Sequence, residues 1–263
     1  MDVELITEDR SSESSDPLIQ KFSKEVPKII IDKDLPDQYY DNDMVIDVPQ
    51  RGFSTTSPGY PYSILGTSGL GPCTSLVLYD SISKTLAVTH VDIYAFMISN
   101  DIKREPEEII KRLEIEAKIK DVPYTDTFSP IEYNFEKIIN SMVKKGMNKN
   151  NNKLRAYILG GRTGISEHVI KNTYDILEKH NIPMVGINIL GGKCGRSYLV
   201  DTNTNFYTFN FSKFKHKPYL DYLFYFFLLE YDPEKLTGGR NIDYNYKYKK
   251  YKTKYLQLKS LNN

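Results

Sequence analysis

The chain has 263 residues, of which 40% are apolar and 26% charged, enough for one large domain or for a medium-sized domain with extensions. Its 35 Lys and Arg residues nearly balance its 34 Asp and Glu residues, so the overall charge gives no reason to expect a nucleic-acid or membrane partner. With two cysteines and an acidic N-terminus that lacks a secretory signal pattern, we expect a reducing, cytoplasmic location and no disulfide framework.

The first 55 residues are predicted to form a mostly extended, partly disordered extension. They include a polar run at residues 11–17 (SSESSDP) and a short apolar run at residues 26–31, which Pro27 interrupts. Such a segment buries little apolar surface by itself, so we expect it to dock onto the rest of the chain by one short strand.

The middle of the chain, residues 56–215, alternates strand-like and helix-like patterns. Two β-like runs, residues 75–79 and 85–91, flank a short polar turn and predict a hairpin. Helices are predicted at residues 105–119, 135–143 and 166–180, the last capped by Ser166, and strands at residues 155–159, 185–190, 198–200 and 206–211. Strands mixed with helices, some of them joined by hairpins, indicate an α/β (α+β) domain with a mixed sheet.

The C-terminal segment, residues 216–263, is predicted to be an aromatic, Tyr/Lys-rich helical extension. Its apolar run, residues 219–231, is shorter than the ~20 residues that span a bilayer, so we expect a buried helix or strand there. From residue 244 onward, tyrosines recur at helical spacing among lysines, which favours an amphipathic basic helix. That helix could contact RNA, an acidic protein or a sister subunit, or it could cap its own domain.

The hairpin brings a cysteine and a histidine together. If its turn centres between Ser81 and Ile82, the numbers of facing residues sum to 163, and His90 faces Cys73 with Cβ atoms about 4.5–5.5 Å apart. A turn one residue longer would instead place Val91 opposite the cysteine.

An imidazole that faces a cysteine can activate its thiol. It can take the thiol proton of Cys73, form a reactive ion pair, and later protonate a leaving amine. Gly69 and Gly71, just before the cysteine, could leave backbone N–H groups free to bind an oxyanion. The structural alternative is a small buried thiol beside a core histidine whose hydrogen bonds are satisfied.

Residues 70–80 (LGPCTSLVLYD) resemble the nucleophile motif of the chemotaxis-receptor glutamine deamidase family (CheD). In that family an LG-S-C run opens a strand ending in LYD, a His follows seventeen residues after the Cys, and a Thr stands six residues before it. His90 and Thr67 occupy those positions. The resemblance implies that Cys73 is the nucleophile, His90 the general base and Thr67 the residue that orients the imidazole.

Three further segments extend the resemblance, which covers about residues 62–102 and 133–211. Residues 154–161 resemble a strand ending in a glycine pair, residues 165–177 an IGERN-type helix start, and residues 182–205 a closing GG-x-x-GR segment. The glycines and arginine of these motifs are candidates for substrate-binding or structural roles: Gly160, Gly161, Gly191, Gly192 and Arg196. The resemblance implies a catalytic domain over residues 56–215 with an insertion at about 103–130. Its fold would be a sandwich of mixed β-sheets with outer helices, as in the catalytic domains of cytotoxic necrotizing factor toxins.

The family converts glutamine side chains of a partner protein to glutamate through a thioester, and some members hydrolyse glutamyl methyl esters. The resemblance therefore implies a protein substrate with an exposed glutamine and no cofactor. The chain departs from the family at Pro72, which replaces the usual Ser and has no N–H to donate, and at Val91-Asp92 after the histidine. These departures leave two alternatives, a non-catalytic binding module of the same fold and a Cys-dependent esterase or peptidase.

Other motifs give weaker indications of function. Residues 160–164 lie between a strand and a helix but lack the spacing of a phosphate-binding loop. Cys194 with His168 or His180 has neither the number nor the spacing of metal ligands, so no metal is expected. The Tyr/Lys-rich tail is similar to C-termini found in large DNA viruses, which favours a host or viral protein as the substrate.

Overall fold

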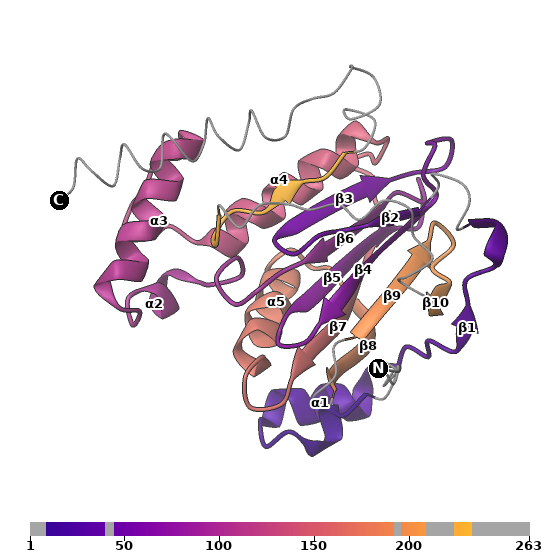
Figure 1. Cartoon of the computed structure of the whole chain (residues 1–263), viewed down its shortest axis with the longest axis horizontal. Helices are drawn as coiled ribbons and strands as arrows, with labels where there is room; N and C mark the ends of the chain where they lie inside the picture. Colours follow the sequence, from indigo (N-terminus) through magenta and orange to yellow (C-terminus); the bar gives the residue numbers. More distant parts are fainter. Residues whose placement is uncertain (1–8, 40–44, 192–195, 209–223, 233–263) are drawn as a thin grey trace.

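The computed structural model describes residues 9–39, 45–191, 196–208 and 224–232. Two β-sheets pack face to face, and helices cover the outer face of the larger sheet (Figure 1). Each sheet contains parallel and antiparallel strand pairs. The predicted class, an α/β (α+β) arrangement of mixed sheets with outer helices, is therefore confirmed.

The six-stranded sheet holds the centre of the fold. Its strand order is β11 (Leu229–Glu230), β3 (Gly52–Thr56), β6 (Leu86–His90), β5 (Thr74–Asp80), β7 (Leu154–Arg162) and β8 (Met184–Gly191). All of β5 is buried, because helices cover one face of the sheet and the second sheet covers the other. Alternate residues serve the two faces: Leu76 and Leu78 pack on the helices, whereas Val77 and Tyr79 face the second sheet.

The second sheet has five strands, in the order β1 (Lys33–Asp34), β10 (Phe206–Thr208), β9 (Arg196–Asp201), β4 (Ile64–Leu70) and β2 (Val45–Asp47). The predicted hairpin between the last two middle-region strands is confirmed, since β9 and β10 pair antiparallel. Tyr198 of β9 is fully buried between the sheets, and its hydroxyl lies 2.5 Å from Oγ of Ser75 on β5. This hydrogen bond joins the two sheets across an otherwise apolar layer.

The predicted helices of the middle region are confirmed as α3 (Glu107–Lys120), α4 (Pro130–Lys144) and α5 (Glu167–Lys179). The second begins earlier than predicted, at Pro130, because proline suits the first turn of a helix. α4 and α5 pack on the outer face of the six-stranded sheet, while α3 and the short α2 (Ser99–Ile102) lie to one side of the sandwich (Figure 1). Two 3-10 turns, Ser11–Glu13 and Asp37–Tyr39, complete the described elements.

The prediction that residues 1–55 are mostly extended is wrong for Pro17–Glu25, which form helix α1. Asp16 caps this helix by accepting two backbone N–H groups at 2.9 and 3.3 Å. Ile19 and Phe22 are buried in the same cluster as the outer helices, so the helix is held by tertiary packing.

The predicted division of the chain differs from the observed packing in two places. The boundary between residues 55 and 56 falls inside β3, an interior strand of the six-stranded sheet. Residues 224–228 bury three phenylalanines against α3 of the predicted insertion, and β11 then adds to β3. Residues 219–223 of the apolar run and the Tyr/Lys-rich tail from residue 244 lie outside the described residues.

The β5–β6 hairpin has a different register from the one predicted. Val77 faces Val88 and Tyr79 faces Leu86, so facing numbers sum to 165 instead of 163. The turn is wider than expected because the carboxylate of Asp80 accepts the N–H of Ser83 at 3.0 Å, and Lys84 then takes a left-handed conformation with φ of 56°.

Candidate active site

Cys73 lies in the short connection between β4 and β5. Before it, Ser166 Oγ donates to the carbonyl of Pro72 at 2.7 Å; after it, Thr74 and Val91 exchange two backbone hydrogen bonds of 2.9 Å. Ser166 precedes α5 but does not cap it through its side chain as predicted, because its hydroxyl is engaged in this contact. The backbone around the candidate nucleophile is thus fixed on both sides.

The glycine pair of β7 shapes this connection. Gly160 has a φ of 86°, and a Cβ built there would lie 2.8 Å from the carbonyl oxygen of Cys73. Gly161 donates its N–H to that same oxygen at 2.8 Å. Of the two roles predicted for these glycines, the contacts therefore support the structural one: they let β7 approach the Cys73 connection closely.

His90 and Thr67 meet across the two sheets. His90 ends β6, Thr67 lies on β4 of the other sheet, and Nδ1 of the histidine is 2.7 Å from Oγ1 of the threonine. Thr67 donates its single hydroxyl proton to the carbonyl of Val48, also at 2.7 Å. Nδ1 of His90 must then be the donor in the contact with Thr67, which leaves Nε2 as the unprotonated nitrogen of the neutral ring.

The structure places Cys73 and His90 on one face of the sheet but does not join them. With facing numbers that sum to 165, Cys73 is aligned with Asp92 and His90 is its diagonal neighbour. The predicted facing pair is therefore wrong, but a shift of two residues keeps both side chains on the same face. Nε2 of His90 has no hydrogen-bond partner among the described residues, so no bond connects it to the thiol.

Burial makes the resting pair neutral. Cys73 and His90 are only 6% and 4% exposed. Burial, and to a lesser degree the charge of Asp92, raise the pKa of the Cys73 thiol to about 12. Burial, with a contribution from the charge of Arg51, lowers the pKa of His90 to about 4. The thiolate–imidazolium pair predicted from the sequence is thus not the resting state of this site.

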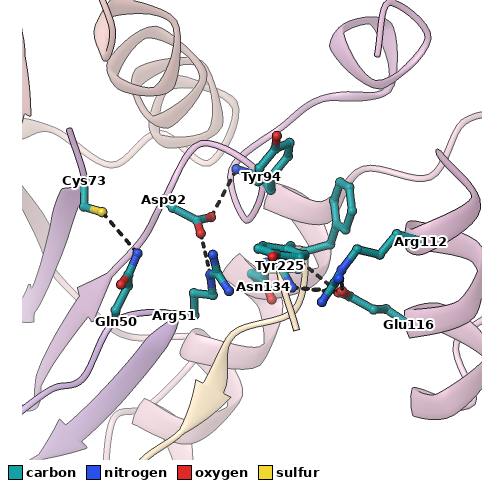
Figure 2. Close-up of polar contacts among 10 residues, drawn as sticks. Gln50, Arg51, Cys73, Asp92, Tyr94, Arg112, Glu116, Asn134 and Tyr225 are labelled. Carbon is teal, nitrogen blue, oxygen red and sulfur yellow. Dashed lines mark hydrogen bonds and ion pairs between the residues drawn. The ribbon is translucent and has the colours of Figure 1, made fainter. Parts of the chain in front are cut away.

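Three side chains that the sequence did not single out as functional border the thiol (Figure 2). Gln50 Nε2 donates to Sγ of Cys73 at 3.6 Å, and Arg51 Nε forms a 2.5 Å ion pair with Oδ2 of Asp92. Asp92 was visible in the sequence as a charged residue two positions after His90. Gln50 and Arg51 belong to no motif, so no signal in the sequence marked them.

The ion pair is braced from segments outside the region of family resemblance. The Arg51 guanidinium lies 4.0 Å from the ring centroid of Tyr225, and Arg112 of α3 lies 3.6 Å from the same ring. Glu116 of α3 accepts the backbone N–H of Tyr225 at 3.0 Å, which holds the ring in place (Figure 2). The insertion and the C-terminal segment therefore contribute to the surroundings of Cys73.

The prediction that Gly69 and Gly71 supply free N–H groups for an oxyanion is wrong. Gly69 donates to Oγ of Ser197 at 3.2 Å, and Gly71 donates to the carbonyl of Gly69 at 2.8 Å. Gly69 has a φ of 75°, so its glycine identity serves the turn itself. An oxyanion at Cys73 would need donors from elsewhere.

The remaining candidate residues lie near the end of β8 and the start of β9. Gly191 ends β8 and the backbone of Arg196 pairs with Leu70 at the end of β4, whereas Gly192 and Cys194 lie outside the described residues. No group of three potential metal-ligating side chains occurs in the part of the chain that the structure describes. Among the described helices, none is long and apolar enough to cross a membrane.

Comparison with known proteins gives one weak similarity. No family model matches the chain. Over 201 residues it is 26% identical to the uncharacterized protein R721 of Acanthamoeba polyphaga mimivirus, an alignment covering 73% of this chain. The chain spans 66% of that protein's length, just under two thirds. The tail and this alignment therefore both show similarity to proteins of large DNA viruses.

Proposed function

We propose that this chain hydrolyses the side-chain amide of a glutamine in a partner protein, with Cys73 as nucleophile and His90 as general base. The observation that carries the proposal is the Thr67–His90 hydrogen bond of 2.7 Å. It fixes the tautomer in which Nε2 can accept a proton, on the face of the sheet that also carries the thiol. Catalytic hydrogen bonds often shorten only when substrate binds, so the absence of a resting Cys73–His90 bond is compatible with this role.

The proposed chemistry proceeds by acyl transfer. Sγ of Cys73 attacks the amide carbon as its proton moves to Nε2 of His90, and the C=O π electrons become a lone pair on oxygen. When the C=O bond re-forms, the C–N bond breaks and His90 returns the proton to the nitrogen, which leaves as ammonia. Water then attacks the thioester with His90 as base, releasing glutamate and restoring the thiol.

The neutral resting pair sets how this attack must occur. Because the thiol pKa is raised and the imidazole pKa lowered, separated charges are disfavoured before substrate binds. Proton transfer is therefore coupled to formation of the S–C bond. The low exposure of Cys73 also favours a slender side-chain amide as substrate over a main-chain peptide bond, since a main-chain bond needs a wider opening.

The proposal also includes where in the cell the reaction takes place. The similarity to a mimivirus protein supports a substrate in an infected cell, either a host protein or a viral one, in the host cytoplasm.

The test incubates the full chain with an amoebal lysate in heavy-oxygen water, so that each newly formed glutamate carries the isotope. Mass spectrometry then identifies labelled glutamates at glutamine positions, and ammonia release is measured in parallel. Wild type is expected to label a small set of sites, and Cys73→Ala and His90→Gln are expected to label none. Equal labelling by wild type and Cys73→Ala would remove the proposal.

A non-catalytic binding module is the second candidate, and the buried thiol with its raised pKa favours it. A module predicts that a lysate protein is retained equally by wild type and by Cys73→Ala, with no labelled glutamate in either. An enzyme predicts labelling that depends on Cys73 and His90, whether or not a complex survives isolation.

A further inference from the structure

The backbone leading to Cys73 offers few donors for an oxyanion. The N–H groups of Gly69 and Gly71 are engaged, and Pro72 has none. Thr74, after the cysteine, donates to Val91 at 2.9 Å. Within the described residues, the N–H of Cys73 makes no hydrogen bond, so it remains as one available donor.

Gln50 supplies a second donor at the reacting sulfur. Its Nε2 group contacts Sγ of Cys73 at 3.6 Å (Figure 2). In the tetrahedral intermediate, the oxyanion is bonded to the same carbon as Sγ, so it lies beside the sulfur. An amide that already donates to Sγ needs only a small side-chain rotation to donate to that oxygen, and Gln side chains are suited to this task.

The segment that carries Gln50 is built into the site. Val48 accepts the hydroxyl of Thr67, and Arg51 donates its N–H to the carbonyl of His90 at 2.7 Å. Residues 48–51 therefore contact Thr67, Cys73 and His90, the three predicted catalytic residues. Arg51 has a φ of 62°, a left-handed conformation that is uncommon outside glycine and concentrates at functional sites.

The turn that contains Arg51 is also held by a backbone hydrogen bond and by the side chain of Arg51. Gly52 donates to the carbonyl of Pro49 at 3.0 Å, which closes the turn, and the Arg51–Asp92 ion pair anchors it beside Cys73. A donor held by a closed turn and an ion pair loses little freedom when it binds an oxyanion. Such pre-organisation is what electrostatic stabilisation of a transition state requires.

We infer that the side-chain amide of Gln50 and the N–H of Cys73 form the oxyanion hole of this site, with Arg51 and Asp92 positioning Gln50. The inference rests on the proposed function. It makes Gln50 a catalytic residue that touches the reacting atoms, and it explains how Pro72 can replace a residue with an N–H.

Two thiol reagents separate this role from a structural one. A blocked peptide with a glutamate γ-semialdehyde forms a thiohemiacetal at Cys73, whose oxygen occupies the oxyanion position. Iodoacetamide alkylates the same sulfur without creating an oxyanion. Gln50→Ala is expected to weaken the aldehyde adduct on the order of 10²-fold. Alkylation should slow by a much smaller factor, because the hydrogen bond from Gln50 is only a minor influence on the pKa of the thiol.

Matched variants control the experiment. Gln50→Met keeps the length of the side chain but removes the donor, and it is expected to behave as Gln50→Ala does. Gln20→Ala removes a glutamine at an exposed position on α1, whose side chain donates to a backbone carbonyl. This substitution should leave both reactions unchanged. Cys73→Ala is the blank for both reagents.

Each other outcome overturns the inference. Unchanged aldehyde binding in both Gln50 variants would show that the amide does not stabilise the oxygen. Equal losses in both reactions would show that Gln50 only places the thiol, and tighter aldehyde binding would show that it obstructs the site. A wild-type protein that is alkylated but forms no aldehyde adduct has no oxyanion hole. Failure of the proposed function would appear in a different experiment, as glutamate labelling that does not depend on Cys73.

Discussion

The hydroxyl of Thr67 is engaged twice, as donor to Val48 and as acceptor from His90, each at 2.7 Å. Thr67→Val keeps the shape of the side chain but removes both contacts. We expect kcat for glutamine hydrolysis to fall on the order of 10²-fold, because the imidazole loses the group that fixes its tautomer. Two buried polar groups are also left without partners, which should lower the free energy of unfolding by about 1–3 kcal/mol.

Thr67→Ser is the matched control for this substitution, since it retains the hydroxyl. Ammonia release gives kcat, and denaturant unfolding gives stability. Equal activity of Thr67→Val and wild type would mean that the threonine does not orient the base.

The lowered pKa of His90 predicts how the stability of the chain depends on pH. Burial and the charge of Arg51 lower its pKa from 6.5 to about 4 in the folded chain. Between those values the unfolded chain binds a proton that the folded chain does not, so this residue makes stability decrease as pH falls from about 6.5 towards about 4. Denaturant unfolding at neutral pH and at about pH 5 should show a smaller loss for His90→Gln than for wild type. Parallel losses in the two proteins would contradict a depressed pKa.

At the scale of single residues, the sequence could predict which side chains share a face but not which ones touch. Period-two alternation places Cys73 and His90 on one side of the sheet for any even shift in register. The position along the strands depends on how Asp80 organises its turn, and that is a matter of side-chain hydrogen bonding. Gln50 escaped prediction because its contact with Cys73 depends on the left-handed conformation of Arg51, for which a non-glycine sequence carries no marker.

At the scale of elements, α3 holds the C-terminal segment against the site. Glu116 is fully buried and accepts the backbone N–H groups of Tyr225 and Phe226 at 3.0 Å, while Arg112 pairs with it at 2.9 Å. Glu116→Ala leaves these donors without an acceptor, and we expect a loss of about 3 kcal/mol in the free energy of unfolding. Hydrogen exchange should rise most in residues 224–230.

The same helix provides the control. Glu107 pairs with Lys111 on the exposed surface, at the same spacing of four residues as the buried pair. Glu107→Ala should leave both stability and exchange near wild-type values, because exposed pairs contribute little. Similar effects of the two substitutions would mean that Glu116 does not anchor the C-terminal segment.

Helices were predicted correctly where apolar residues recur at helical spacing over a long segment. They were missed where tertiary packing determines the local structure. α5 and the buried face of α4 follow from apolar residues at helical spacing. α1 is a short helix in polar sequence, and it forms because Ile19 and Phe22 are buried against neighbouring helices. The short apolar run at residues 219–231 left helix and strand undecided, and its described part is mostly irregular, because the phenylalanines pack on α3 and Glu116 binds its backbone.

At the scale of the whole molecule, the second sheet could not be derived from periodicity. The buried strand β5 indicates that both faces of its sheet are covered, but either helices or another sheet would satisfy that pattern. The sandwich was instead implied by the family resemblance, and the structure agrees with it in having two mixed sheets. The Tyr198 hydroxyl is buried and finds a partner in Oγ of Ser75, which itself donates to the carbonyl of Thr89, so this bond constrains how the sheets align.

The size of the folding unit follows from the position of β3. A chain trimmed to the predicted catalytic domain, residues 56–215, lacks almost all of β3, and with it Phe53, which is fully buried. Truncation of one such phenylalanine costs about 3–5 kcal/mol, against a typical total stability of about 5–15 kcal/mol. The trimmed chain also loses α1 and the cluster around residues 224–228, so we expect it to show no cooperative unfolding transition. The full chain should unfold in a single transition when it is measured by denaturant. Cooperative unfolding of residues 56–215 would show that the flanking segments are dispensable and that the site folds without Gln50.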